Sequence, residues 1–491
     1  MTILSRKSRR WLGVMLSVLL IVLLGHLPLP AVAASPRHYN ELTFPPLPEV
    51  KLPSYERYQL ANGLTVYLME DHQLPLVKGY TLIRAGTRWD APEQVGLAQL
   101  TGTVLRLGGT QQHSPDEINE ALEQRAANIE ANVSEVAASV NFDALSEDLA
   151  PVLSLFGEIL CYPAFAAEQL ALAKVQKQGE IARRNDDPGD IADREFQKLI
   201  YGSTSPYART VEYETLANID RQDLVTFHQR YFHPDRMILG IVGDFEPQEL
   251  KALIEKTLGD WPKSNSRAIA EVPPAAQANP QGLFLVERPQ LTQSNILLGH
   301  LGGQFNAPDY PALSVLNAVL NGFGGRLFNE VRSRQGLAYS VYGYWSPRFD
   351  YPGLFLAGGQ TRSETTVPFV RSLLAEIEQI RSTPVPDTEL AEAKESILNS
   401  FVFQFDSPAE SLTRIMRYDY FGYPQDFLFE YQRAVKATTA TAVLQAAQTH
   451  LRPDQIVTLV VGNNREIQPP LSTLGSEVKT VDIARPQPPS S

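Results

Sequence analysis

An internal repeat constrains the fold of this chain more than any other feature of its sequence. DLVTFHQRYFHPDRMILGIVGDF in the first half resembles AVLQAAQTHLRPDQIVTLVVGNN in the second, and Gly243 of the first segment aligns with Gly462 of the second. Both segments are typical of a helix, a turn at Pro-Asp and an apolar strand. The segments that begin at Leu74 and Leu291 are also alike, at nearly the same offset. We therefore expect a duplicated unit of about 220 residues.

Each predicted unit contains strands followed by helices. In the first unit we expect strands at 64–70, at 76–84 and within 129–141, and helices at 95–107, 151–160 and 168–184. Ser114, Pro115 and Glu117 predict a further helix start, with a serine N-cap, a proline at the first helical position and a glutamate at the third. This arrangement predicts an α+β fold of two tandem α/β sandwich units, with helices lying on mainly antiparallel sheets.

The repeat and the local composition divide the chain into five parts. Residues 263–282 contain three prolines among small and polar residues, which predicts a linker. The chain ends in RPQPPSS, which is typical of a disordered tail. We predict a signal peptide at 1–34, an N-terminal domain at 35–262, a linker at 263–282, a C-terminal domain at 283–480 and a tail at 481–491.

The N-terminus has the pattern of an export signal. A basic region at 6–10 precedes an apolar run at 11–25, and the sequence AVAA at 31–34 is typical of a cleavage site. The apolar run is shorter than the roughly 20 residues that span a membrane. We expect an exported mature chain in the periplasm or another extracytoplasmic space. If the signal is not cleaved, the chain stays associated with the membrane.

Charge and cysteine content argue against several classes of function. The 55 acidic residues outnumber the 43 basic ones, and the net charge of −12 argues against nucleic-acid binding, which needs a basic surface. Cys161 is the only cysteine, so neither an intramolecular disulfide nor a cysteine-based zinc site can form. Because Cys161 lies in the apolar stretch 156–165, we expect it to be a small core residue.

One segment of the first half resembles the signature region of a known enzyme family. GTRWDAPEQVGLAQLTGTVLRLGGT, residues 86–110, is similar to the signature of the pitrilysin/insulinase family of zinc peptidases, which includes the mitochondrial processing peptidases. The resemblance extends from about residue 55 to about residue 464. It implies the duplicated α+β unit that the repeat also predicts. The matching residues are Gly86, Arg88, Pro92, Gly96, Leu97, Ala98, Gly109 and Thr110.

The zinc ligands of that family are missing at the matching positions. In active members the motif H-x-x-E-H places two imidazoles one helical turn apart, and its glutamate acts as general base. Here those positions hold Gln99, Gly102 and Thr103. Glu180 follows Thr103 at a spacing similar to that of the family's third ligand, but one carboxylate cannot hold zinc in a closed site. The resemblance therefore implies a chain without zinc or another cofactor, in which Glu180 can be a solvated or salt-bridged helix residue.

No other pattern replaces the missing zinc motif. His228 and His233 are five residues apart, which does not suit a shared helix face, and we expect ordinary residues at a helix end. The sequence contains no recognisable Ser/His/Asp arrangement. The glycine-rich segment 322–325 lacks the Lys-Ser/Thr that follows in a phosphate-binding loop, and we expect a tight turn there.

The second half, by contrast, keeps a family motif. LNGFGGRLFNEVRSRQGLAYSVYGYW, residues 320–345, resembles the segment in which an arginine and a tyrosine seven residues apart reach the active site. The matching residues are Arg332 and Tyr339, for which the resemblance implies substrate-backbone binding and stabilisation of the developing oxyanion. Two purely structural alternatives remain open. Arg332 can pair with an acidic neighbour, and Tyr339 can join an aromatic cluster with Tyr342 and Tyr344.

These observations give two hypotheses for function. In the first, the chain is inactive alone and is the non-catalytic subunit of a heterodimeric zinc peptidase, where Arg332 and Tyr339 act in trans on an extended peptide bound to a zinc-bearing homologous subunit. The resemblance implies this arrangement, because some family members divide the zinc motif and the Arg/Tyr pair between two subunits. In the second, the chain is a peptide-binding or scaffold homodimer without a proteolytic role.

Overall fold

A computed structural model describes residues 51–265, 271–322 and 324–483 of the chain, and these residues belong to one compact unit, Val50–Ser491. The predicted signal peptide, the end of the predicted tail and the middle of the predicted linker lie outside the described residues. Among the described helices, none is long and apolar enough to cross a membrane.

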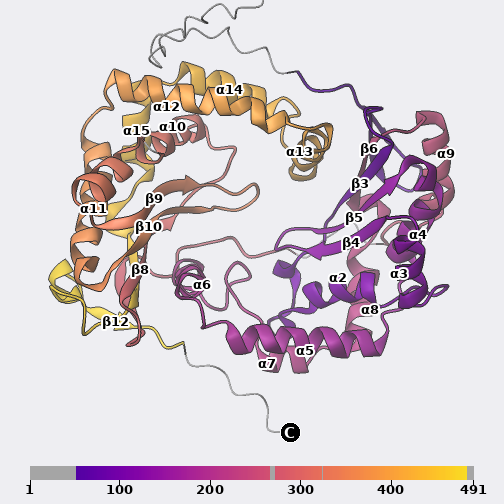
Figure 1. Cartoon of the computed structure of the whole chain (residues 1–491), viewed down its shortest axis with the longest axis horizontal. Helices are drawn as coiled ribbons and strands as arrows, with labels where there is room; N and C mark the ends of the chain where they lie inside the picture. The colour runs from indigo at the N-terminus through magenta and orange to yellow at the C-terminus, as the bar shows by residue number, and fades with distance from the viewer. Residues whose placement is uncertain (1–50, 266–270, 323, 484–491) are drawn as a thin grey trace, which may run out of the picture. The chain divides into compact units, whose positions relative to one another are not determined.

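The first half of the chain builds a six-stranded mixed sheet in the order β1-β2-β6-β3-β5-β4 (Figure 1). In this sheet β2 and β6 run parallel and the other neighbours run antiparallel. The predicted strands are therefore present, and the segment 129–141 divides into two of them. The strands are β1 (Glu56–Gln59), β2 (Thr65–Glu70), β3 (Leu76–Ile83), β4 (Asn128–Val133), β5 (Ala138–Leu145) and β6 (Met237–Gly243).

The second half repeats this arrangement in a sheet of order β12-β7-β11-β8-β10-β9. Here β12 and β11 both run parallel to β7, and the remaining neighbours run antiparallel. The strands are β7 (Gly282–Glu287), β8 (Gln293–Leu301), β9 (Ala338–Ser346), β10 (Leu354–Arg362), β11 (Val457–Gly462) and β12 (Val478–Thr480). After β12, the Val481 amide donates to Leu285 O at 2.8 Å, and Asn185 Nδ2 donates to Ile483 O at 2.6 Å.

The helices of the first half agree with the sequence expectation to within a few residues. Ser114 accepts from the Glu117 amide while the Glu117 side chain accepts from the Ser114 amide, so the predicted N-cap of α3 is confirmed. The helices are α2 (Leu97–Leu107), α3 (Pro115–Glu123), α4 (Leu149–Cys161), α5 (Ala167–Arg183), α6 (Pro188–Tyr201), α7 (Tyr213–Ala217), α8 (Arg221–Tyr231) and α9 (Pro247–Leu258). Short 3-10 turns lie at η2 (Thr87–Trp89), η3 (Pro92–Gln94), η4 (Ser146–Asp148) and η5 (Pro234–Arg236).

The second half contains a corresponding set of helices. They are α10 (Tyr310–Leu320), α11 (Thr366–Ser382), α12 (Asp387–Ser400), α13 (Pro408–Phe421), α14 (Phe427–Ala437) and α15 (Ala440–His450). A π-helical segment, η6 (Phe328–Arg334), precedes β9, and short 3-10 turns lie at η7 (Ser363–Thr365), η8 (Phe401–Phe405), η9 (Pro453–Gln455) and η10 (Leu471–Leu474). The offset between the starts of α6 and α13 equals the offset between the starts of β6 and β11, so the predicted duplication is confirmed.

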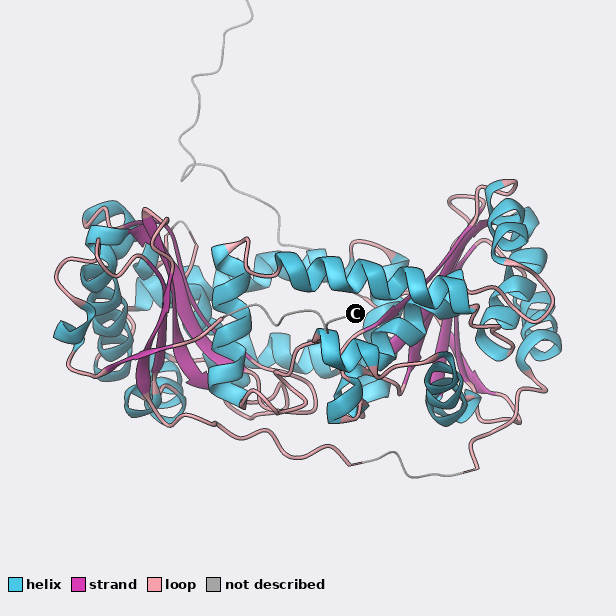
Figure 2. Cartoon of the chain, turned by 90° about the horizontal axis from the view of Figure 1, so that it is seen from below, coloured by secondary structure: helices cyan, strands magenta, loops and turns pink. Residues whose placement is uncertain are grey.

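Each half also contributes one helix to the sheet of the other half. Helix α6 packs on β8 and β11 of the second sheet, whereas α13 packs on β6, β3 and β2 of the first. The view in Figure 2 shows helices on both sides of each sheet. Both faces of the central strands are therefore covered, which is why β6 is a continuous apolar run with all seven residues buried.

Alternate residues of the first sheet belong to two different cores. Val66 and Leu68 of β2 face the core built with α2, α4 and α8, while Tyr67 and Met69 face α13. At Gly240 of β6 an added Cβ would lie 2.2 Å from Met416 Sδ, so glycine lets α13 approach this sheet closely. The exchange of α6 and α13 thus makes each half depend on the other for part of its core.

Candidate functional site

Helix α2 carries the three positions that match the zinc motif, and a buried carboxylate holds its first turn. Asp90 accepts hydrogen bonds from the Gly96 amide at 2.9 Å and the Ala98 amide at 3.0 Å. Burial raises the pKa of Asp90 to about 7, although these two amides oppose the rise. Gly96 has φ of +109°, a left-handed conformation that suits glycine at the sharp entry to the helix.

The zinc-matching positions of α2 do not suit a metal ion. Gln99 and Thr103 are half-buried and uncharged, and Thr103 Oγ1 donates to Gln99 O at 3.1 Å. Gly102 is buried, and an added Cβ would lie only 2.6 Å from Val133 Cγ2 on β4. The space that a catalytic glutamate would need beside the helix is therefore filled by packing, and the residues present do not fit zinc.

Glu180, the remaining residue of the family's ligand set, lies on α5 as a surface group. Its side chain is 61% exposed, and Lys177 Nζ lies 2.8 Å from Glu180 Oε2. Helix α5 packs against α2, but the glutamate that it carries is both solvated and ion-paired. Within the described part of the chain, no group of three or more His, Cys, Asp or Glu side chains could hold a metal ion.

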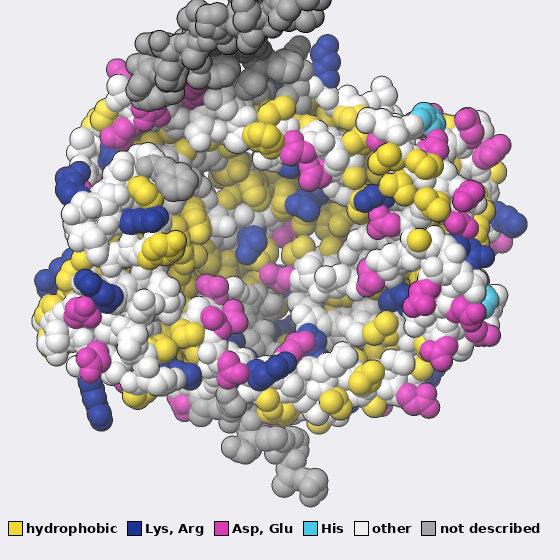
Figure 3. Space-filling model, viewed as in Figure 1, with side chains coloured by type: hydrophobic (Ala, Val, Ile, Leu, Met, Phe, Trp, Pro, Cys, Tyr) yellow, Lys and Arg dark blue, Asp and Glu magenta, His cyan; other side chains and the backbone are white. Residues whose placement is uncertain are grey.

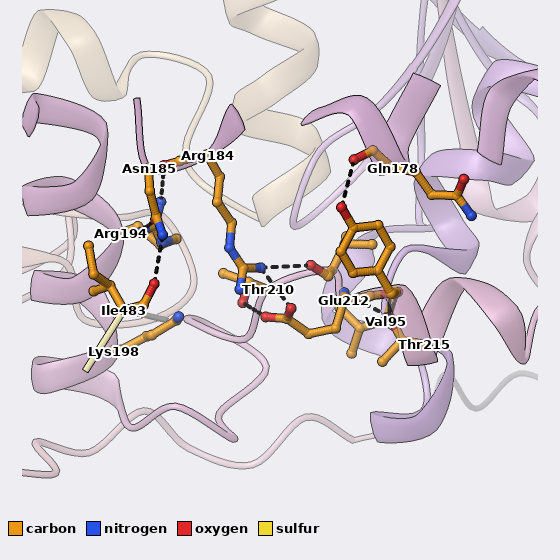
Figure 4. Close-up of polar contacts among 12 residues, drawn as sticks. Val95, Gln178, Arg184, Asn185, Arg194, Lys198, Thr210, Glu212, Thr215 and Ile483 are labelled. Atoms are coloured by element: carbon orange, nitrogen blue, oxygen red, sulfur yellow. Dashed lines mark hydrogen bonds and ion pairs between the residues drawn. The ribbon is translucent and has the colours of Figure 1, made fainter. Parts of the chain in front are cut away.

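Polar contacts fix the elements around α5 (Figure 4). Arg184 Nη1 pairs with Glu212 Oε2 at 2.8 Å, and Thr215 Oγ1 donates to Val95 O at 2.8 Å just before α2 begins. Tyr213 OH donates to Gln178 O at 3.4 Å. These bonds tie α7 to α2 and α5, so the degenerate site is a well-fixed part of the fold.

The histidines considered from the sequence are structural residues in this fold. His228 lies in α8, 8% exposed, and its Nε2 donates to Leu160 O at 2.8 Å; burial lowers its pKa to about 4. His233 follows α8 and bonds Gln229 O at 2.8 Å. Cys161 is partly buried against the first core, and burial raises the pKa of its thiol to about 12. None of these groups is brought to the zinc-matching positions by a contact of the described residues.

Arg332 and Tyr339 lie together in the second half. The Arg332 guanidinium carbon is 4.7 Å from the Phe328 ring centroid and 4.9 Å from the Tyr339 ring centroid, so two aromatic rings hold the cation. These residues line a pocket of about 300 Å³ together with Asn321, Gly322, Ser340 and Val341. Arg332 lies in η6, and such π-helical segments are frequent at functional sites.

Neither structural alternative for this pair matches the geometry. No acidic side chain pairs with Arg332 in the described segments of the chain, whereas the neighbouring Arg334 pairs with Glu330 at 2.9 Å. Tyr342 and Tyr344 stack on each other with ring centroids 5.2 Å apart, and Tyr339 is not in that stack. The Tyr339 side chain is 83% exposed, so its hydroxyl is available to an external partner.

The backbone around Tyr339 is also accessible. Strand β9 is the last strand of the second sheet, paired on one side with β10, and its other edge has no strand partner among the described residues. Asn321 supports this region, because its side chain donates to Gly343 O at 2.6 Å and accepts from the Gly343 amide at 3.0 Å. An edge strand with an exposed tyrosine and a held guanidinium can bind an extended peptide and a developing negative charge.

Sequence reasoning missed three features of the site region. The role of Phe328 as the second ring on Arg332 has no sequence signal. The contact between the halves was also missed: Arg88 Nη1 lies 2.6 Å from Asp350 Oδ2, and Tyr351 OH donates to Glu135 Oε2 at 2.7 Å. Burial raises the pKa of Glu135, which the bond from Tyr351 opposes. The third feature is the closure of the space beside Gly102.

Comparison with known proteins gives the family. The model described as Insulinase (Peptidase family M16) matches residues 66–207, and the model described as Peptidase M16 inactive domain matches residues 218–397. The two matches together span well over half of the chain. The protein therefore belongs to the M16 (insulinase) family, and the predicted resemblance is confirmed.

Similar proteins include both named proteases and a named non-peptidase. An uncharacterized zinc protease YmxG of Bacillus subtilis is 25% identical over 73% of this chain and 86% of its own length. A non-peptidase homolog YmxG of Helicobacter pylori is 22% identical over 81% of this chain and 91% of its own length. The crystal structure of a peptidase M16 inactive domain from Pseudomonas fluorescens has a TM-score of 0.74 at 26% identity, covering 84% of this chain and 98% of that one.

The fold is also shared with a periplasmic enzyme. The periplasmic protease PqqL of Escherichia coli has a TM-score of 0.70 at 16% identity, covering 88% of this chain and 48% of that chain. This likeness concerns the fold. It shows that the same tandem sandwich architecture is used in a protein described as periplasmic.

Proposed function

We propose that this chain is an exported, non-catalytic M16 subunit that supplies Arg332 and Tyr339 to a zinc-bearing homologous partner. The observation that carries the proposal is the contrast between the two halves. The position for a catalytic glutamate is packed closed at Gly102, while the Arg332–Tyr339 pocket is open and its tyrosine is 83% exposed. The chain alone is inactive in this proposal and holds no zinc.

The roles follow from the chemistry of the two side chains. The Tyr339 hydroxyl can donate a hydrogen bond to a carbonyl oxygen as negative charge develops on it. The Arg332 guanidinium offers several hydrogen-bond donors to the peptide backbone. Because Phe328 and Tyr339 hold it on two sides, little conformational freedom is lost when substrate binds.

Export is supported by the N-terminal pattern of a basic region, an apolar run and AVAA at 31–34. The described residues begin after this segment. The mature protein would meet its partner and its peptide substrate outside the cytoplasm. Mass spectrometry of the N-terminus of the exported protein tests this part, because cleavage near residue 34 is expected.

The catalytic role is tested with the reconstituted pair. We expect the mature chain to copurify with a homologue from its own host that contains intact H-x-x-E-H. The pair should cleave an internally quenched peptide that neither subunit cleaves alone. Tyr339→Phe removes one hydroxyl and should lower turnover about 100-fold or more, as removal of one oxyanion donor does in other enzymes. Arg332→Ala should lower it to a similar degree.

Matched substitutions on the same elements serve as controls. Arg334→Ala changes an exposed arginine two residues from Arg332, and Tyr344→Phe changes a tyrosine on the same strand as Tyr339. Both variants should assemble with the partner and keep near-normal turnover. If the Tyr339→Phe variant and the Tyr344→Phe variant, each reconstituted with the partner subunit, turn over the peptide equally fast, Tyr339 does not have the proposed role in catalysis. A stable homodimer that recovers no zinc-bearing homologue from the host would favour the peptide-binding scaffold.

A further inference from the structure

A second pocket of the C-terminal half is lined by aromatic rings and two arginines. Its volume is about 400 Å³, which is within the range of sites for small organic ligands. Tyr310, Phe349, Phe401 and Tyr431 form much of its wall. In the space-filling view, hydrophobic side chains gather in the hollowed part of the face shown, with basic side chains among them (Figure 3).

The aromatic wall is a connected cluster around Phe349. This ring stacks on Phe421 with centroids 4.7 Å apart and lies 4.6 Å from the Phe305 ring. Tyr423 OH donates to Phe349 O at 2.7 Å and so fixes the loop that presents the ring. A fixed wall loses little entropy when an apolar group enters, and aromatic surfaces contribute strongly to binding.

Arg414 and Arg417 of α13 bring positive charge to this pocket. They lie one helical turn apart, and both line it. Neither has an ion-pair partner among the described residues, and Arg414 Nε is buried without a hydrogen-bond partner. The Tyr418 hydroxyl hydrogen-bonds with Arg414 and provides no compensating charge. Arg417 is the more exposed of the two. Desolvation by its surroundings, and after it the neighbouring Arg414, lower the pKa of Arg417.

In the other copy of the repeat, the equivalent arginine has an ion pair and a side-chain hydrogen bond. Arg194 occupies the same position in α6 that Arg414 occupies in α13, since each is the seventh residue of its helix. Its Nε donates to Glu195 Oε1 at 2.8 Å. Its Nη2 donates to Asn185 Oδ1 at 2.8 Å, and both of these residues are labelled in Figure 4. The residue that corresponds to Glu195 is Ile415. The second copy therefore has the arginine at this position but an apolar residue in place of the adjacent carboxylate.

We propose that this pocket binds the C-terminal residue of a peptide, with an apolar side chain among the aromatic rings and the free carboxylate on Arg414 and Arg417. A carboxylate supplies the negative charge that Glu195 supplies to Arg194, and the aromatic walls favour a large apolar side chain. Gln404 also lines the pocket and can pair with a peptide group, which an aliphatic acid does not have. The inference concerns binding alone and does not depend on turnover or on a partner subunit.

The test compares two peptides that differ only at the C-terminal group. Isothermal titration calorimetry with the mature chain would use acetyl-Ala-Ala-Phe as the free acid and as the amide. We expect the acid to bind at least about 10-fold more tightly, because charge-assisted hydrogen bonds contribute more than neutral ones. Arg414→Gln and Arg417→Gln should each weaken binding of the acid about 10-fold, and the double variant should bind acid and amide equally.

A control variant and a competing ligand complete the experiment. Arg433→Gln changes an exposed arginine of α14 that pairs with Asp426 at 3.7 Å and does not line the pocket, so it should leave affinity unchanged. Thermal melting checks that each variant is folded, and the comparison of acid with amide on the unmodified chain stands whatever the variants do. Equal affinity for acid and amide, no binding of either, or preference for laurate over the peptide would overturn the inference.

Discussion

The two halves of the molecule have the same order of elements, but the candidate site is closed by packing in the first half and open to solvent in the second. In the first half, β4 packs on α2 so closely that Gly102 has no space for a side chain. In the second half, the pocket at Arg332 is open and the Tyr339 side chain lies in solvent. An exposed aromatic side chain adds little to folding, since it buries little apolar area. The difference is one of packing: the first half has no room for a side chain at Gly102, while the second half exposes an aromatic group that stability does not require.

The exchanged helices show the same divergence at equivalent positions. Arg194 of α6 is neutralised within its own half, whereas Arg414 of α13 faces an aromatic pocket without a carboxylate. Both helices begin at a proline after a side-chain N-cap, Asp187 and Ser407, so the backbone frame is conserved between the copies. Similar backbone frames therefore carry an ion-paired arginine in one copy and a pocket-lining arginine in the other.

The largest effect is expected when the zinc motif is written back into α2. In the variant Gln99→His, Gly102→Glu, Thr103→His, the glutamate has to enter space occupied by Val133, and we expect its carboxylate to be buried there. Overpacking and burial of an unpaired charge should lower the free energy of unfolding by about 3 kcal/mol or more. Urea denaturation measures this loss, and elemental analysis of the refolded variant should find no stoichiometric zinc.

The matched control keeps Gly102 and changes only the two half-buried positions. Gln99→His with Thr103→His should alter the free energy of unfolding by no more than about 1 kcal/mol. The claim that packing closes the site of the first half would be wrong if the triple variant folded with the stability of the unmodified chain and bound one zinc ion. Glycine at position 102 would then mean only that the general base is missing, and it would not be a sign of repacking.

A pH dependence is expected from one buried histidine in each half. His228 lies in the first core and His300 is fully buried on β8; burial lowers the pKa of each to about 4. His300 Nδ1 donates to Leu301 O and its Nε2 accepts from the Arg452 amide at 3.1 Å, which requires the neutral ring. In the unfolded chain each ring takes up a proton near pH 6.5.

The sign of the effect follows from proton uptake by the unfolded state. Stability from these histidines is present above pH 6.5 and is lost as the pH falls from 6.5 to about 4, by about 3 kcal/mol for each. Urea denaturation at a series of pH values should show this loss, and His228→Gln or His300→Asn should each reduce the slope. If only one substitution changes the slope, the two halves do not share this acid sensitivity.

Much of the fold could be predicted because its signals are local or periodic. The repeat, the strands near Leu64 and Leu76 and the capping box at Ser114 each follow from side chains close in sequence. The exchange of α6 and α13 could not be predicted, because an amphipathic helix does not specify which of two similar apolar sheets it covers. The apolar run of β6 agrees with a strand covered on both faces, but it does not identify the helix that covers it.

The candidate site also contains residues that the sequence could predict and contacts that it could not. Gln99, Gly102, Thr103, Arg332 and Tyr339 were found because they occupy positions of a recognisable motif. Their functional roles remain predictions. Three features depend on distances between separate elements: the packing of Val133 at Gly102, the Phe328 ring on Arg332, and the Arg414 Nε that lacks a hydrogen bond within the described segments. Such contacts have no signal in one sequence, since any of several residues could have filled the same space.

The smallest predicted effect compares two glycines on the neighbouring helices α2 and α5. An alanine Cβ at Gly102 would meet Val133, whereas one at Gly179 would have no atom within 4 Å. Alanine gains about 0.5–1 kcal/mol over glycine inside a helix, so Gly179→Ala should stabilise the protein by that amount. At Gly102 overpacking of about 1–3 kcal/mol exceeds this gain, and Gly102→Ala should destabilise by about 1 kcal/mol. Thermal and urea denaturation would measure both, and opposite signs are required. If both substitutions stabilise the protein, Val133 of β4 can move to admit a side chain at position 102. The space beside α2 is then not closed by packing.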